Sequence, residues 1–142
     1  MKKFAMAAAT AALLLSVSTG ALAATGLGSV TSMSGSAATA DKAGSVTVNT
    51  TMCALELDDE GKIVSVSFDI AQNKIGFDAA GALTTDLAAE HPTKKELKEG
   101  YGMKGASSIG KEWYEQAEAL EAWCVGKTVA EVVGMPTYDK GD

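Results

Sequence analysis

Alternating apolar and polar residues predict that the first ordered part of this chain is a β-sheet. Along residues 63–71, four apolar side chains alternate with mostly polar ones: Val64, Val66, Phe68 and Ile70. Residues 45–57 are rich in Val and Thr, which favour strands, and their alternation changes phase at residues 51–54, where we expect a β-bulge. Asp58-Asp59-Glu60-Gly61 between the two segments is typical of a turn. The pattern predicts a long antiparallel hairpin with one apolar face.

Weaker strand signals lie on both sides of this hairpin. Residues 74–77 predict a separate third strand, with residues 82–85 as its return arm after a turn. Residues 24–44 consist largely of Ala, Gly, Ser and Thr, which bury little apolar surface. We therefore expect a flexible leader there, with residues 28–33 as an alternative short strand, and order beginning near Gly44.

The periodicity becomes helical after residue 86. Thr93 and Glu96 form a capping-box pattern that opens a short helix ending at Gly100. The main helix is expected over residues 107–124. Its apolar stripe comprises Ile109, Trp113, Ala117, Leu120 and Cys124, with Trp123 beside it, and the solvent face comprises Lys111, Glu112, Glu115, Glu118 and Glu121.

A second capping box, Thr128 to Glu131, predicts a last short helix closed by Gly134. Strands followed by helices indicate an α+β fold, a small antiparallel sheet covered on one face by one main helix and short helices. Such a core is thin. We therefore expect either that the chain is truncated at its C-terminus or that a partner covers part of the sheet.

The N-terminus predicts export. Lys2 and Lys3 precede an apolar run over residues 4–17, and Ala21-Leu22-Ala23 forms a small-x-small cleavage site. The expected organisation is a signal peptide at residues 1–23, the leader at 24–44, one domain at 45–138 and a polar tail at 139–142. The mature protein would be secreted or held in the cell envelope, with no transmembrane segment after cleavage.

The net negative charge argues against nucleic acid as a partner. After removal of residues 1–23, ten Lys and no Arg face 18 Asp and Glu, a net charge of −8. Phosphate backbones are bound by clustered cations, so an acidic chain without Arg is not expected to bind nucleic acid.

The sequence offers no catalytic or metal-binding arrangement. His91, the single histidine, lies in a polar loop and is expected to be solvated. Cys53 and Cys124 stand in apolar patterns, which leaves two alternatives, two buried thiols or one disulfide. We therefore do not expect an enzyme.

Three segments carry a resemblance that covers most of residues 27–138. They are Val46-Thr47-Val48-Asn49-Thr50-Thr51, Asp59-Glu60-Gly61-Lys62-Ile63-Val64-Ser65-Val66, and the segment from Tyr101-Gly102-Met103-Lys104-Gly105-Ala106-Ser107 to Tyr114. They resemble uncharacterised secreted or lipid-anchored proteins of anaerobic Gram-positive bacteria. That group is distantly similar to the extracellular FMN-binding domain family, and its members usually continue with a further strand and helix.

The resemblance implies a flavin site. In that family FMN is attached through its phosphate to a Thr or Ser in an Asp-x-x-Ser/Thr-Gly-Ala-Thr/Ser motif. Gly105, Ala106 and Ser107 match this motif, whereas Tyr101 stands in place of the Asp and Lys104 in place of the first hydroxyl residue. FMN is thus the cofactor that the resemblance implies, with Ser107 as the acceptor hydroxyl.

The position of this loop also predicts an anion-binding site, independently of the resemblance. At the expected start of the main helix, free backbone N–H groups favour an anion, and Lys104 adds positive charge. An ordinary N-cap at Ser107 or Ser108 is the alternative. The predicted cofactor-binding residues are Tyr101, Lys104, Gly105, Ala106, Ser107 and Ser108. Trp113 and Trp123 are expected in the core.

Two functions remain open at this point. The first is a secreted, non-catalytic binding module that resembles FMN-binding domains and serves extracellular electron transfer. The second is a cofactor-free structural or protein-interaction module of the cell envelope.

Overall fold

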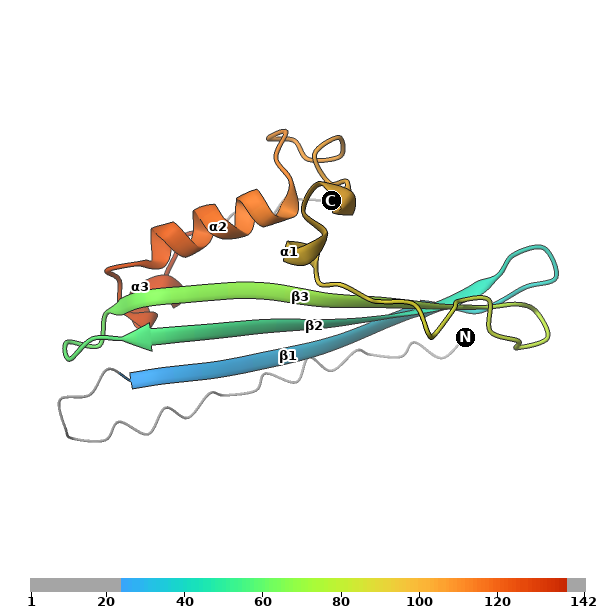
Figure 1. Ribbon diagram of the computed structural model, residues 1–142, viewed down its shortest axis with the longest axis horizontal. Coiled ribbons are helices and arrows are strands. Elements are labelled where there is room, and N and C mark those ends of the chain that lie inside the picture. Colours follow the sequence, from blue (N-terminus) through green and yellow to red (C-terminus); the bar gives the residue numbers. More distant parts are fainter. Residues whose placement is uncertain (1–23, 138–142) are drawn as a thin grey trace.

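The computed structural model describes residues 24–137, which form a three-stranded antiparallel sheet followed by helices (Figure 1). The strands are β1 (Ala24–Ser36), β2 (Gly44–Leu57) and β3 (Ile63–Phe77), in the spatial order β1-β2-β3. The helices are α1 (Lys94–Leu97), the 3₁₀ helix η1 (Lys98–Tyr101), α2 (Trp113–Cys124) and α3 (Val129–Val133). The predicted α+β class is confirmed. The predicted signal peptide at residues 1–23 and the polar tail at 139–142 lie outside the described residues.

The predicted flexible leader is wrong over residues 24–36. This segment is a 13-residue strand that pairs with β2 along its whole length, from Ala24 opposite Leu57 to Ser36 opposite Ser45. Gly and Ser give a segment little strand propensity of its own. A continuous ladder to a neighbouring strand supplies the missing stabilisation, and the paired residues lie between 9 (Ser36 and Ser45) and 33 (Ala24 and Leu57) positions apart in the sequence.

The hairpin of β2 and β3 is confirmed. Its turn is held by the Asp58 carboxylate, which accepts hydrogen bonds from the backbone N–H groups of Glu60 and Lys62, both at 2.9 Å. Gly61 takes a left-handed conformation there, with a φ of 77°. The register shifts between Glu56 and Leu57, not at the predicted residues 51–54.

The change of phase in β2 has a different cause from a bulge. Cys53 lies opposite Phe68, whose side chain faces α2, and the register places Met52 and Val48 on the other face of the sheet. The apolar residues near the end of β2, such as Cys53 and Leu55, thus lie on the face of the sheet that α2 covers. Those near its start, such as Val46 and Val48, lie on the opposite face. The predicted third strand at 74–77 is likewise the end of β3, and its return arm is reduced to one bridge between Phe77 and Leu83.

Helix α2 begins six residues later than predicted. Gly110 has a φ of 63°, a left-handed conformation that interrupts a helix, and the N-cap is Glu112. Ile109 therefore lies outside the helix with 66% of its surface exposed, although its spacing matched the apolar stripe. Both predicted capping boxes, Thr93 with Glu96 and Thr128 with Glu131, are confirmed.

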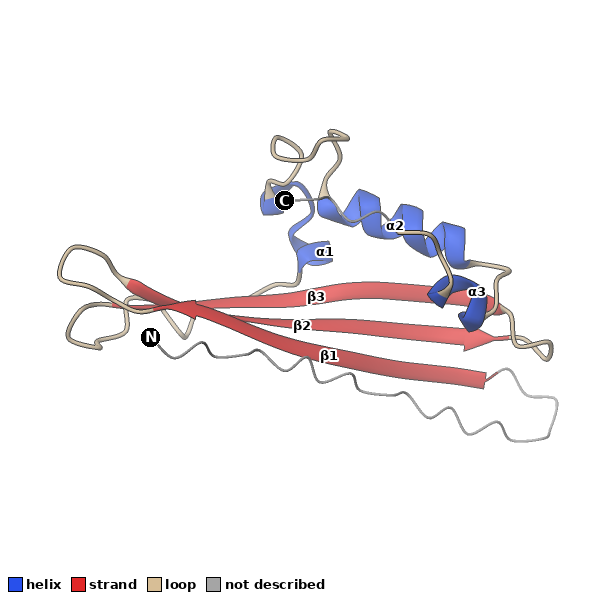
Figure 2. Cartoon of the chain, turned by 180° about the vertical axis from the view of Figure 1, so that it is seen from behind, coloured by secondary structure: helices blue, strands red, loops and turns tan. Residues whose placement is uncertain are grey.

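The hydrophobic core is small and lies where α2 meets β3. Its buried apolar residues are Ile63, Ala117 and Cys124. Helix α2 runs beside β3, and no described helix covers the β1 side of the sheet (Figure 2). Trp123 was expected in the core, but 37% of its surface is exposed and the Lys127 ammonium lies 4.3 Å from the centroid of its ring.

Candidate functional site

An apolar cleft of about 460 Å³ lies between the sheet and α2. It is lined from the sheet by Thr51, Phe68 and Ile70, from α2 by Trp113, Gln116, Ala117 and Leu120, and from the preceding loop by Met103. The single-turn spacing of Trp113, Ala117 and Leu120 aims all three at β3. The cleft thus presents two aromatic rings, a thioether and one amide.

The loop that carries the predicted flavin motif is fastened to the start of α2. Glu112, only 5% exposed, accepts hydrogen bonds from the backbone N–H groups of Met103 at 2.8 Å and Lys104 at 3.1 Å. The Gln116 amide donates to the Ser107 hydroxyl at 3.2 Å. Because Met103 and Gln116 also line the cleft, the loop at residues 103–108 lies directly beside it.

The predicted anion site at a helix N-terminus is wrong, because Gly105–Ser108 precede α2 by several residues. Four of the backbone N–H groups in this loop are also occupied. Those of Ala106 and Ser107 both donate to the Met103 carbonyl at 2.9 Å, and those of Met103 and Lys104 are held by Glu112. The groups of this loop that a phosphate could contact are therefore mainly the side chains of Lys104, Ser107 and Ser108. Gly105 and Ala106 lie exposed between them.

Aromatic side chains and one cation lie beside the cleft. The Lys94 ammonium is 4.6 Å from the centroid of the Tyr101 ring and 5.6 Å from that of Trp113. Tyr114 points elsewhere, and its hydroxyl donates to the Glu99 carboxylate at 2.9 Å. This hydrogen bond raises the pKa of Tyr114 to about 12. Tyr101 is thus the tyrosine that lies beside the cleft.

Four glutamates were assigned to the solvent face of the main helix, and the assignment is wrong for two of them, Glu112 and Glu121. Glu112 is buried as described above. Glu121 accepts a hydrogen bond from the backbone N–H of Phe68 and forms an ion pair with Lys95, both at 2.5 Å. The partners lie 53 and 26 residues away, which is why helical periodicity alone could not find them.

Both cysteines are free thiols, so the disulfide alternative is not formed. Cys124 is fully buried and Cys53 is half-buried. Burial is the main cause that raises the pKa of each thiol. These are properties of packed, unreactive cysteines.

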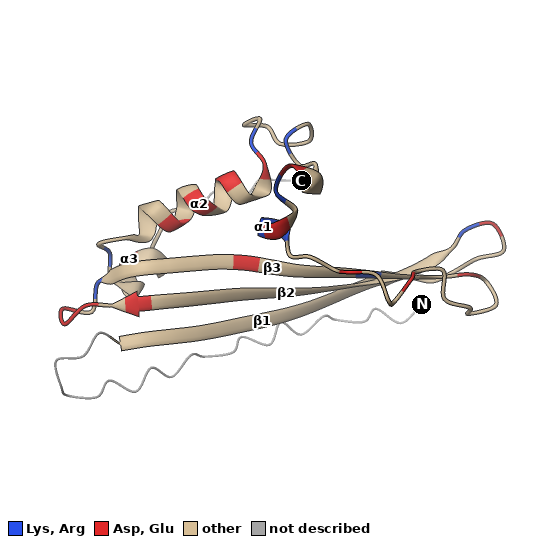
Figure 3. Cartoon of the chain, in the orientation of Figure 1, with Lys and Arg blue, Asp and Glu red and all other residues tan. Residues whose placement is uncertain are grey.

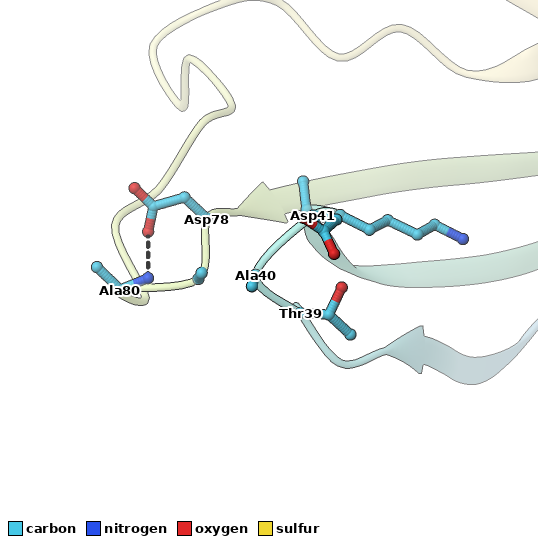
Figure 4. Close-up of a pocket in the computed structure, with 8 residues that line it drawn as sticks. Thr39, Ala40, Asp41, Asp78 and Ala80 are labelled. Atoms are coloured by element: carbon cyan, nitrogen blue, oxygen red, sulfur yellow. Dashed lines mark hydrogen bonds between the residues drawn. The ribbon is translucent and has the colours of Figure 1, made fainter.

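A second hollow, of about 380 Å³, lies at the far end of the sheet between two turns (Figure 4). Its acidic residues are Asp41 and Asp78, and Asp78 is used by its own turn, accepting from Ala80 and Ala82 at 2.9 Å. Within residues 24–137 no cluster of three His, Cys, Asp or Glu side chains is placed to hold a metal ion. His91 is exposed, as expected.

Comparison with known proteins gives one informative similarity. The chain is similar to a protein named chlorophenol reductase from Desulfitobacterium hafniense, with 38% identity over 96 residues. The aligned part covers 60% of this chain and 29% of that protein, so the chain spans less than a third of its relative. No protein-family profile matches the chain, and no solved structure does. None of the helices between residues 24 and 137 is long and apolar enough to span a membrane.

Proposed function

We propose that this protein is an exported, non-catalytic module that binds a planar aromatic cofactor of the flavin class and serves electron transfer. The observation that carries this proposal is the apolar cleft between β3 and α2. It presents the rings of Phe68 and Trp113, and it adjoins residues 103–108, the loop that resembles a flavin-attachment motif. Ligand sites of this kind are apolar clefts with a few polar groups.

Each residue around the cleft has a role in this proposal. Trp113 and Phe68 hold the flat ring by stacking and apolar contact. The amide nitrogen of Gln116 already donates to Ser107 and to the Lys111 carbonyl, so its side-chain oxygen offers the ring an acceptor. Lys104 and Lys94 supply positive charge for the phosphate. The Ser108 hydroxyl is exposed, whereas that of Ser107 already accepts from Gln116 and from the Ile109 N–H. Bound FMN would supply the redox chemistry, and the chain would supply binding and orientation.

The similarity to a protein named chlorophenol reductase supports a redox setting. Since the aligned part covers 29% of that protein, we propose that a module of this kind accompanies the reducing centre and does not contain it.

Two tryptophans make the cleft directly testable. Trp113 lines the cleft, and Trp123 lies outside it beside Lys127. In a Trp123→Leu variant, the remaining indole should be quenched on titration with FMN. In the matched Trp113→Leu variant, the quenching should disappear and affinity should fall at least about tenfold, because a buried aromatic contact is lost. Absence of quenching in the folded Trp123→Leu protein at millimolar FMN would refute the proposal.

Two further measurements define the phosphate site. Riboflavin, which lacks the phosphate, should bind within about tenfold of FMN because four of the six backbone N–H groups at residues 103–108 are already occupied. Intact mass after export from a host with a flavin-attaching enzyme tests the covalent form. If FMN is attached at the position that the motif predicts, Ser107→Ala should abolish the mass gain; retention of the gain would instead assign attachment to another hydroxyl, such as that of Ser108.

The second candidate function is a cofactor-free interaction module. The observation that favours it is the exposed apolar surface of the sheet, where Leu27 and Met33 are 75% and 67% exposed. A folded protein that binds neither FMN nor riboflavin would favour this alternative.

A further inference from the structure

Strand β1 is an open edge of the sheet. It pairs with β2 over its 13 residues, and within residues 24–137 no other strand lies on its outer side. Between Ala24 and Ser36 there is no charged residue and no proline (Figure 3). A long, uncharged edge strand exposes unpaired backbone N–H and C=O groups and is a template for another strand.

The sequence of β1 is close to symmetric about Val30. Reading outward in both directions, the paired positions are Ser29 and Thr31, Gly28 and Ser32, Leu27 and Met33, and Gly26 and Ser34. Each pair matches in size or polarity. Its large apolar members are also exposed, Leu27 at 75%, Val30 at 55% and Met33 at 67%.

We propose that two copies of this chain pair through β1 in antiparallel orientation, with Val30 opposite Val30 of the second copy. Such a pairing is self-complementary about a two-fold axis, as a dimer of identical chains requires. It places Leu27 opposite Met33 of the second copy, twice per dimer, on the face of the sheet away from α2. The two three-stranded sheets become one continuous six-stranded sheet.

The distribution of charge favours this edge for self-association. The chain is acidic, with a formal net charge of −6, so two copies repel each other over most of their surface. The described Asp and Glu side chains lie in β2, β3, the turns and the helices, and β1 has none (Figure 3). Helix α2 packs on β3, two strands away, and leaves the β1 edge clear.

The register gives a charge-swap test on the mature protein without added flavin. Sedimentation velocity should show a dimer for the unmodified chain. Leu27→Lys and Met33→Glu alone should each raise the dimer dissociation constant about tenfold or more, because each change removes an apolar cross-strand pair twice. The double variant should return to within about threefold, because the ammonium introduced at position 27 then faces the carboxylate introduced at position 33 of the second copy.

Compensation in the double variant cannot arise within one chain. Residues 27 and 33 are six positions apart on one strand, roughly 20 Å at about 3.3 Å per residue. Val133→Lys is the matched control, since it replaces an apolar residue that is 80% exposed on α3, away from β1, and should leave the dissociation constant within about threefold. Far-UV circular dichroism of each variant verifies folding.

Three outcomes would overturn the proposal. A protein that stays monomeric at every concentration would exclude self-pairing through β1, and a strand of a different protein would become the candidate partner of this edge. A dimer insensitive to both single changes would place the interface elsewhere, and the absence of rescue in the double variant would exclude the Val30-centred register. None of these outcomes bears on flavin binding, which takes place in the cleft at β3.

Discussion

The β3 edge of the sheet is covered by helices and loops, whereas nothing among residues 24–137 covers the β1 edge. On β3, the Phe68 N–H is bound by Glu121, the Gly76 N–H by the Thr85 hydroxyl at 2.8 Å, and the Ile63 N–H by the Lys127 carbonyl at 2.8 Å. On β1, no described element outside the sheet supplies such a partner. One sheet thus combines an edge closed by the chain itself with an edge open to a second strand.

The two edges are therefore expected to have different roles in this small sheet. The buried apolar residues Ile63, Ala117 and Cys124 all lie in β3 or in the helix that packs on it. The open edge contributes backbone pairing to β2 and little buried surface. The free energy of unfolding of the monomer should therefore depend mainly on β3, and the proposed pairing of two copies on β1.

The largest effect should come from truncating the β3 side of the core. Ile63 is 3% exposed, and Ile63→Ala should lower the free energy of unfolding by about 2–5 kcal/mol through lost burial and a cavity. Leu27→Ala, the matched change on β1, should cost less than about 0.5 kcal/mol in the monomer. Urea denaturation of dilute protein measures both, and equal losses at the two sites would contradict the comparison.

A smaller effect should follow from opening the β3 edge. Glu121→Ala removes the acceptor of the Phe68 N–H and leaves the Lys95 ammonium, whose side chain is 22% exposed, without its partner. We expect a loss of about 1–3 kcal/mol, the usual cost of leaving such groups unsatisfied. Glu118→Ala, on the exposed side of the same helix, should stay within about 0.5 kcal/mol.

The smallest effect concerns acid sensitivity at the α3 end of the covered edge. Hydrogen bonds from the Thr128 backbone and hydroxyl hold the pKa of Glu131 below its ordinary value of 4.5. The folded-state pKa lies below the unfolded one, so this contribution is present above about pH 4.5 and is lost as pH falls through the folded value.

Thr128→Ala should bring the pKa of Glu131 back toward 4.5, as measured by NMR titration of the carboxylate. Glu131→Gln should remove this part of the acid dependence of unfolding. An unchanged Glu131 titration in Thr128→Ala would assign the shift to the backbone hydrogen bond alone.

Features set by neighbouring residues were predictable from the sequence. The Asp58–Gly61 turn and the two capping boxes depend on side chains within four positions of the backbone they bind, so their residue types suffice. The alternation of residues 63–71 likewise identified the first nine residues of β3. The order of strands before helices then led to the α+β class.

Features set by distant partners were not predictable in this way. Strand β1 depends on its ladder to β2, and Glu112 is buried because the loop at residues 103–104 folds onto it. The start of α2 was misplaced because Ile109 falls in phase with Trp113, and the left-handed Gly110 overrides that phase. The motif residues 104–108 could be named from the sequence, but the cleft beside them could not, since Phe68 and Ile70 reach it from β3.

The sheet extends well past the described helices (Figure 1). Beyond Ile70, strand β3 continues for seven residues, roughly 20 Å at about 3.3 Å per residue, toward the turns at 39–42 and 78–81 (Figure 1). The described helices do not cover this part of the sheet, so the strands are held there by their ladders to one another (Figure 1).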